Sequence, residues 1–140
     1  MKPGLVADCS VIAAWFFEDE RNPYAEMVLD RLTRESAVVP ILFYLEIGNV
    51  FLIAERKRRI TRADSNRLVS FLLELPIVPD QENPSQRLKE WMDMGRSHSL
   101  TAYDAAYLEL ASRTGLPLAT LDKRLRKAAA SLGIALFDRG

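Results

Sequence analysis

The sequence has very few of the residues that build disulfides and zinc sites, and it has no excess of either charge. Cys9 and His98 are the only cysteine and the only histidine among its 140 residues. A single thiol closes no internal disulfide, and no Cys or His residues stand at zinc-binding spacings. Nineteen basic and nineteen acidic side chains leave no net charge, so bulk electrostatics does not attract a polyanion. Any binding to nucleic acid must therefore use a local group of cations.

The sequence also lacks a long apolar segment. Before Glu46, the longest run without a formal charge covers residues 36–45, which is too short to span a bilayer. The first residues lead directly into a strand-like segment, instead of a basic region followed by a long apolar one. We therefore expect a protein without a membrane segment that works in the reducing cytoplasm.

Short β-like segments alternate with longer helical ones along the chain, whose length is typical of one domain. Strands separated by helices imply right-handed crossovers, so we expect a parallel sheet with helices on both faces. The sequence thus predicts a single α/β domain over residues 1–140 with three layers in the order α/β/α. The predicted strands cover residues 5–7, 37–39, 77–78, 118–121 and 134–137.

Helix-starting and helix-ending residues mark the segments between these strands. Thr61 and Asp64 form a capping-box pattern before a helix that we expect to reach residue 75. Gly115 is expected to end the helix that begins at Thr101 and reaches about residue 113. The other predicted helix starts are Ser10 as an N-cap, Asn22 before Pro23, Pro40 for a helix to about residue 59, Asn83 before Pro84 for a helix that includes Leu88 and Trp91, and residue 123 for a helix to about 131.

Three aspartates stand where predicted strands or turns lead into helices. Asp8 follows the first apolar segment, and Asp122 follows residues 117–121. Ligands of parallel sheets bind at the carboxyl ends of the strands, so we expect both carboxylates at this edge. Either aspartate could instead serve only as a helix N-cap. Asp104 follows Thr101 by three residues and has a similar structural alternative, because an acid in the first turn suits the helix dipole.

Glu46 is the only charged residue between residues 41 and 54. A carboxylate in such apolar surroundings is costly unless it is paired or binds a metal. Asn49 lies three residues later on the same face of the predicted helix, where its amide could hydrogen-bond the carboxylate. The alternative is that Glu46 lies on a narrow solvent-facing edge or pairs with a distant arginine.

These acidic residues lie in four segments that resemble the motifs of a known family. The segments are VADCSV at residues 6–11, VP at 39–40 with LEIGN at 45–49, LTAYDAAYL at 100–108 and LPLATLD at 116–122. In this order they resemble PIN-domain ribonucleases, and specifically the VapC-type toxins of toxin–antitoxin pairs, over nearly the whole chain. The resemblance implies that the catalytic and metal-binding quartet is Asp8, Glu46, Asp104 and Asp122, with Ser10 and Thr120 beside it.

The chemistry of such a quartet agrees with the resemblance. Several carboxylates in one pocket repel one another and suit a hard divalent cation, Mg²⁺ or its substitute Mn²⁺. A cation of this kind polarises a phosphodiester and activates an attacking water, so the expected reaction is hydrolysis of a phosphodiester. The resemblance implies that the substrate is RNA. We expect Asp8 and Asp104 to be direct ligands, with Glu46 and Asp122 in support and in water orientation.

Contacts to the RNA should come from local positive charge. Lys123, Arg124 and Arg126 follow Asp122 directly and are the candidates for binding phosphates. The basic stretch at residues 56–59 is a second candidate, although cations also suit the C-terminal end of a helix.

Two protein partners are also expected. The resemblance implies an antitoxin whose C-terminal segment covers the active site, with an arginine among the carboxylates. It also implies a homodimer. Large apolar residues in the first half of the chain exceed what one helix buries in a monomer, and they favour such an interface: Phe43, Tyr44, Phe51 and Leu52.

Functions of other classes fit less well. A phosphatase with an aspartate nucleophile needs a second aspartate two residues later, where Ser10 stands. A response-regulator receiver needs an acidic pair after the first strand and an acceptor aspartate after a middle strand, for which Asp80 is a poor candidate. A PIN-like binding module without catalysis and a non-toxin RNA-processing nuclease remain open alternatives.

Overall fold

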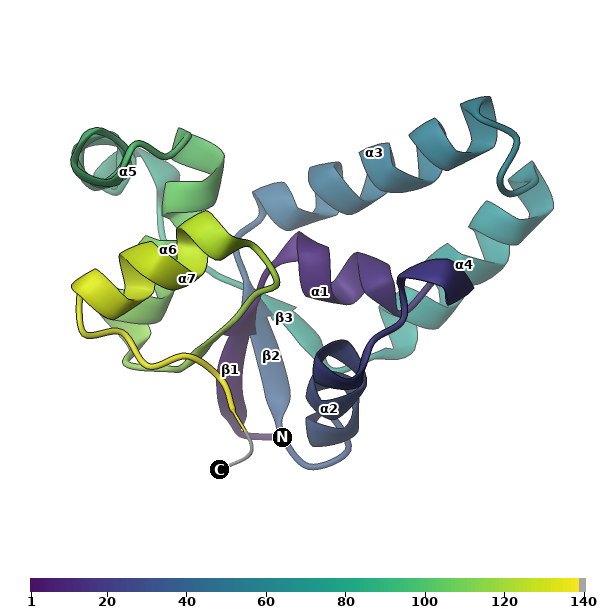
Figure 1. Ribbon diagram of the computed structural model, residues 1–140, viewed down its shortest axis with the longest axis horizontal. Helices are drawn as coiled ribbons and strands as arrows, with labels where there is room; N and C mark the ends of the chain where they lie inside the picture. The colour runs from purple at the N-terminus through teal and green to yellow at the C-terminus, as the bar shows by residue number, and fades with distance from the viewer. Residues whose placement is uncertain (139–140) are drawn as a thin grey trace.

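A four-stranded parallel sheet forms the centre of the fold, with helices on both of its faces (Figure 1). The protein is described by a computed structural model over residues 1–138. The strands lie in the order β3-β2-β1-β4. Their bounds are Pro3–Ala7 for β1, Ser36–Val39 for β2, Ile77–Pro79 for β3 and Leu118–Ala119 for β4. The predicted three-layer α/β fold is confirmed.

The helices alternate with these strands, as the sequence pattern predicted. None of those in residues 1–138 is long and apolar enough to cross a membrane. The α-helices are α1 (Cys9–Ala14), α2 (Pro23–Arg31), α3 (Leu42–Arg56), α4 (Arg62–Glu74), α5 (Leu88–His98), α6 (Ala102–Thr114) and α7 (Lys123–Ser131). Single 3-10 turns cover Glu18–Glu20 (η1) and Pro84–Gln86 (η2).

Most of the helix boundaries follow from the capping residues. Asn22 accepts the backbone N–H of Ala25 at the start of α2. Thr61 and Asp64 form the reciprocal pair of hydrogen bonds of a capping box at α4. Gly115 ends α6 at φ 71°, a left-handed conformation that glycine adopts without steric cost. These three predictions are confirmed.

Two predicted elements at the start and middle of the chain differ from the structure. The N-cap of α1 is Asp8 instead of Ser10, because the Asp8 carboxylate accepts the N–H of Val11. The helix predicted from Asn83 is broken into η2 and α5. Asn83 accepts the N–H of Ser85, only two residues later, and this local bond closes a tight turn that ends before α5 begins.

The end of the chain also has less strand than predicted. Residues 134–137 form only an isolated bridge between Leu136 and Leu118. The strand predicted to 121 ends at Ala119, because the next backbone N–H groups bond to side chains. Leu121 N–H donates to the Ser10 hydroxyl, and Asp122 N–H donates to the Thr120 hydroxyl.

The predicted excess of apolar residues in the first half of the chain is only partly exposed. Phe43 and Phe51 are buried in the core, where Phe51 packs edge-to-face against Phe16. Leu52 is exposed, and Tyr44 is half-buried. Phe43 and Phe51 therefore stabilise the monomer and are not available for an interface.

A buried ionic cluster ties α6 to the loop that follows β3. Glu109 is only 2% exposed, and Arg113, one turn later, donates to its carboxylate at 2.8 Å. Arg113 also donates to Asp80 at 2.7 Å. Arg87 lies 3.9 Å from Glu109. A buried carboxylate without such partners would carry the full cost of desolvation.

We therefore predict that Arg113→Met lowers the free energy of unfolding by about 3 kcal/mol, because it leaves Glu109 buried and poorly paired. Arg67→Met is the matched control, since Arg67 pairs with Asp64 on the exposed surface of α4. Its effect should stay within about 0.5 kcal/mol. Urea denaturation of both variants measures the difference, and equal effects would contradict the structural role of the cluster.

Candidate active site

Asp8 connects the end of β1 to the end of β4. It follows β1 directly and is only 3% exposed. Its Oδ1 accepts the Ser10 hydroxyl at 2.6 Å, and its Oδ2 accepts the Thr120 hydroxyl at 2.5 Å. Its backbone N–H donates to Ala119 across the sheet at 3.0 Å. The structure thus brings together Asp8, Ser10 and Thr120, which the motifs had grouped.

Burial makes the ionised form of this carboxylate unfavourable. Desolvation raises the pKa of Asp8 from 3.8 to about 6, although the hydroxyls of Ser10 and Thr120 act against the rise. The negative charge of Asp122 raises it further. Asp8 is also the N-cap of α1. The helix-capping role that was the alternative for this residue and its proposed role in the site therefore both apply to it.

Glu46 on α3 is held by a residue that was not among the predicted site residues. The Tyr107 hydroxyl donates to Glu46 Oε1 at 2.5 Å, while the rest of the Tyr107 side chain is buried. Asn49, the predicted partner, is exposed and makes no hydrogen bond to Glu46 within residues 1–138. The spacing of Tyr107, one helical turn after Asp104, was the signal that could have identified it.

The remaining two aspartates stand at the starts of α6 and α7. Asp104 N–H donates to the Thr101 hydroxyl, as predicted. The Asp122 carboxylate accepts the N–H groups of Arg124 and Leu125, so Asp122 is the N-cap of α7. The Asp122 side chain therefore has a structural role as a cap, whereas the cap of α6 is Thr101 and Asp104 stands in its first turn.

The charges of the four carboxylates affect one another. Burial raises the pKa of Glu46, and the charge of Asp104 adds to the rise. Burial also raises the pKa of Asp104, with a contribution from Asp122, whereas Arg124 lowers it. Asp122 in turn raises the pKa of Asp8. The charges of the carboxylates thus act on one another in pairs, Asp8 with Asp122, Asp122 with Asp104 and Asp104 with Glu46.

The donor atoms of these carboxylates suit a hard cation. Within residues 1–138, no three carboxylate, histidine or cysteine side chains are already close enough together to enclose an ion. Mg²⁺ needs only one or two direct carboxylates and keeps several waters, so the arrangement is compatible with it. Burial raises the pKa of Cys9 to about 12, so its thiol stays protonated and is not a nucleophile.

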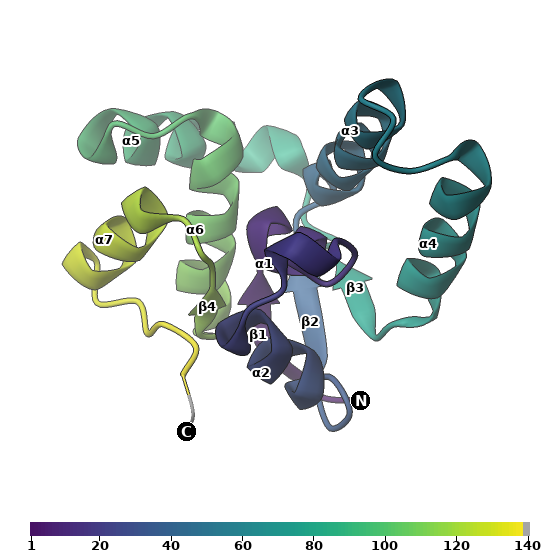
Figure 2. The same cartoon turned by 45° about the vertical axis from the view of Figure 1, so that its right-hand side comes forward.

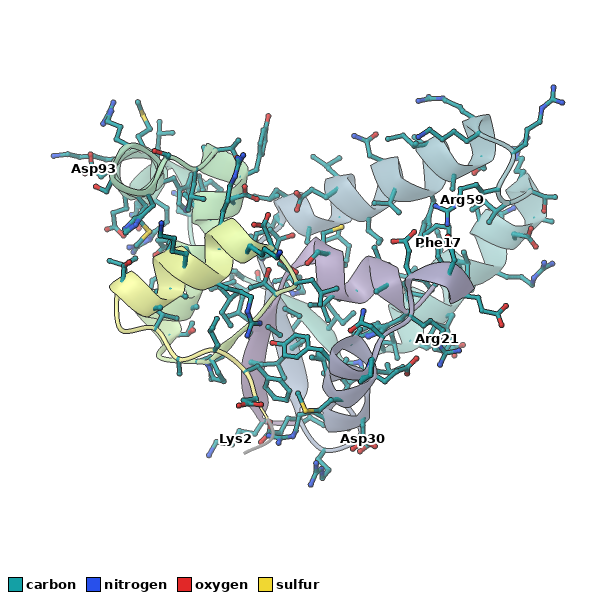
Figure 3. All side chains as sticks on the ribbon, in the orientation of Figure 1. Lys2, Phe17, Arg21, Asp30, Arg59 and Asp93 are labelled. Carbon is teal, nitrogen blue, oxygen red and sulfur yellow. The ribbon has the colours of Figure 1, made fainter. Side chains whose placement is uncertain are left out.

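The basic residues differ in how far they are already engaged. Arg126 donates to the Thr120 carbonyl at 2.9 Å and lies over the Tyr24 ring, so it supports the loop after β4. Arg59, from the other basic stretch, lies over Phe17 and pairs with Asp19 (Figure 3).

Two of the predicted RNA-binding residues remain exposed beside the carboxylates. Lys123 and Arg124 open α7 directly after Asp122 and form no ion pair with another described residue. Their positive charges are therefore available to a ligand.

The raised pKa of Asp8 predicts a pH-dependent cost to stability. The folded protein holds this proton more tightly than the unfolded chain, so stability falls as the pH rises from about 4 to about 6. The difference between 3.8 and about 6 corresponds to roughly 3 kcal/mol. Asp8→Asn does not titrate, so its stability relative to the parent should increase by about 2 kcal/mol between pH 4.5 and 7.5.

Urea denaturation of both proteins in EDTA at the two pH values measures this change. The chelator removes divalent cations that would offset the charge of Asp8. An equal stability difference at pH 4.5 and 7.5 would contradict the raised pKa.

Comparison with known proteins agrees with the fold. The family model described as PIN domain matches residues 5–131. Ribonuclease VapC3 of Pyrobaculum aerophilum is 29% identical over 121 residues, which cover 86% of this chain and 91% of that protein. Two solved structures share the fold. PAE2754 from Pyrobaculum aerophilum has a TM-score of 0.70 and 23% identity, covering 91% of this chain and 87% of its own.

FitAcB from Neisseria gonorrhoeae has a TM-score of 0.67 and 19% identity, covering 96% of both chains. The resemblance to VapC-type PIN proteins that the four motifs indicated is thus confirmed. The family match spans β1 to α7 and includes every member of the acidic quartet. The chain therefore belongs to the PIN-domain family.

Proposed function

We propose that the protein is a metal-dependent endoribonuclease that acts as the toxin of a type II toxin–antitoxin system. The observation that carries the proposal is the buried Asp8 carboxylate, which Ser10 and Thr120 hold at the ends of β1 and β4. The charges of Asp122, Asp104 and Glu46 are coupled to it in succession. The likeness to Ribonuclease VapC3 supports RNA as the substrate. A complete quartet also favours catalysis over a PIN-fold binding module.

The proposed cofactor is Mg²⁺, with Mn²⁺ as a substitute. Asp8 and Asp104 are the proposed direct ligands, supported by Glu46 and Asp122. When bound, the cation supplies charge neutralisation at the phosphodiester and activation of the attacking water. The donors are oxygens only, which suits these two ions better than zinc.

The other side chains hold the carboxylates in place. Ser10 and Thr120 each donate to one oxygen of Asp8, which fixes its plane. Tyr107 donates to one oxygen of Glu46 and leaves the second oxygen of that carboxylate for a ligand or a water. Lys123 and Arg124 are the proposed contacts to the RNA backbone, and Arg126 supports them through the Thr120 carbonyl.

A cognate antitoxin is part of the proposal. Carboxylates whose ionised forms are disfavoured by burial and mutual repulsion are good acceptors for a guanidinium. An arginine from a partner would form charge-assisted hydrogen bonds with them and would exclude the metal. Covering the site in this way would inhibit the enzyme without changing its fold.

The proposal predicts discrete cleavage of RNA that depends on both the metal and Asp8. Purified protein incubated with total cellular RNA should yield discrete fragments with Mg²⁺ or Mn²⁺ and none with EDTA. Asp8→Asn should reduce the rate by at least about a hundredfold, because the site loses a charged ligand. Gel analysis of the fragments and sequencing of their ends would identify the target.

Asp30→Asn is the control for this experiment, because Asp30 is an exposed residue of α2. The Asp30→Asn variant should cleave RNA at the rate of the parent protein. Absence of cleavage with either metal, from folded protein free of any antitoxin, would favour the binding-module alternative. Cleavage confined to a single precursor RNA would favour a non-toxin processing nuclease.

A homodimer is also proposed, through an apolar groove at the start of α3. The groove has a volume of about 440 Å³ and lies between α3, η2, α5 and α6. Leu45 and Tyr103 on its edge are 77% and 65% exposed. Exposed apolar side chains gathered in this way are typical of protein interfaces. The chief apolar residues of the groove are Ile41, Leu45, Leu88, Trp91 and Tyr103.

We predict that Leu45→Glu converts the dimer to a monomer, because a charge at this edge would have to be buried without a partner. Leu73→Glu is the matched control, since Leu73 is 67% exposed on α4, outside the groove. Light scattering coupled to size-exclusion chromatography gives the masses. A parent that is already a monomer, or a Leu45→Glu dimer, would contradict this interface.

A further inference from the structure

A second hollow in the surface lies between the end of α5 and the face of α7. It has a volume of about 630 Å³, within the range of ligand clefts. Both views place α5 and α7 on the same side of the molecule (Figure 1 and Figure 2). The polar residues that line it are Ser97, His98, Ser99, Arg124, Lys127 and Ser131. None of the described lining residues is acidic.

Within residues 1–138 the cations of this hollow take part in no ion pair, although the charge of Arg124 acts on Asp104. Arg124 and Lys127 are three residues apart on α7 and so share one face of the helix. Neither forms an ion pair within residues 1–138, whereas Arg59, Arg87 and Arg113 are paired with carboxylates. Two unpaired cations facing one hollow create a local positive potential in a protein without net charge.

The other side chains of the hollow add hydrogen-bond donors. Each serine hydroxyl can donate one hydrogen bond, and the His98 ring can donate from at least one nitrogen. No side-chain hydrogen bond within residues 1–138 involves His98, Ser97, Ser99 or Ser131. Their donors therefore remain available to an anion with several oxygens.

Arg124 connects this hollow to the candidate active site. It lines the hollow, and its charge lowers the pKa of Asp104. Its backbone N–H donates to Asp122 at 2.8 Å. A ligand that passes from the carboxylates along α7 would reach Arg124 first and Lys127 one turn later.

We propose that this hollow binds a backbone phosphate of the RNA next to the bond that is cut. The inference rests on the proposed ribonuclease function and extends it to the path of the substrate. The metal would neutralise the carboxylates at the scissile phosphate, while Arg124, Lys127 and His98 would hold a neighbouring one. Because these contacts are to phosphate, the hollow would fix the position of the strand and would not read its sequence.

The test measures RNA binding separately from cleavage, in the Asp8→Asn background. A fluorescein-labelled single-stranded RNA of mixed sequence is titrated with protein from 50 to 300 mM NaCl, and its anisotropy gives the affinity. Lys127→Ala should weaken binding and should reduce the slope of log affinity against log salt by about 0.7, the value for one lost phosphate contact on a single strand. His98→Ala should weaken binding with less effect on this slope.

Lys2→Ala is the matched control. Lys2 is exposed and stands before β1, at the amino edge of the sheet (Figure 3). The Lys2→Ala variant should bind RNA with the affinity and salt slope of the Asp8→Asn parent. If Lys127→Ala has the same affinity and salt slope as Lys2→Ala, the proposed phosphate site is wrong. Cleavage by the wild-type protein would in that case still support the ribonuclease function.

Inorganic phosphate distinguishes the two sources of the anion. At constant ionic strength, millimolar phosphate should weaken RNA binding by the parent more than by Lys127→Ala, because phosphate and RNA would compete for the hollow. Phosphate that binds the parent through Lys127 without weakening its RNA binding would assign the hollow to free phosphate and overturn the RNA assignment. If the Asp8→Asn parent binds no RNA and the wild-type protein cleaves none, the ribonuclease function and the phosphate site both fall.

Discussion

The buried carboxylate of Asp8 is the constraint on which the arrangement of the site depends. Its oxygens accept hydrogen bonds from Ser10, Thr120 and the first turn of α1. One side chain therefore sets the start of a helix and joins the ends of β1 and β4. The same burial disfavours its ionised form and raises its pKa to about 6. Such perturbed groups are concentrated at functional sites, where a bound cation or partner compensates for the cost.

Helix α6 links this site to the rest of the fold. Asp104 in its first turn contributes a carboxylate, and Tyr107 one turn later holds Glu46. Glu109 belongs to the buried ionic cluster with Arg113 and the loop after β3. Two of the four carboxylates thus depend on the packing of one helix, directly or through Tyr107. A site built on rigid elements in this way is held more precisely than one built on loops.

The absence of net charge conceals an uneven distribution of cations. Most of the buried or half-buried arginines are neutralised, as Arg87 and Arg113 are by the acids around β3 and α6. The first turns of α7 are different, because Lys123, Arg124 and Lys127 carry no paired carboxylate among the described residues. An acidic site beside an unneutralised basic helix suits a polyanion that also requires a divalent cation.

The sequence by itself determined the alternation of strands and helices, the helix ends at Asn22, Thr61 and Gly115, and the isolation of Glu46. These features follow from neighbouring residues, since capping bonds and hydrophobic periodicity act within about four positions. The four motifs also indicated the family and the acidic residues.

Only the tertiary structure decided which side chains hold those acids. Thr120 bonds to Asp8 across 112 positions, and Tyr107 bonds to Glu46 across 61, where Asn49 had been expected. The packing of β4 beside β1, and of α6 near α3, creates these contacts. Local patterns carry no information about such pairs, because the loops between them leave the relative placement of the elements to the packing of the whole core.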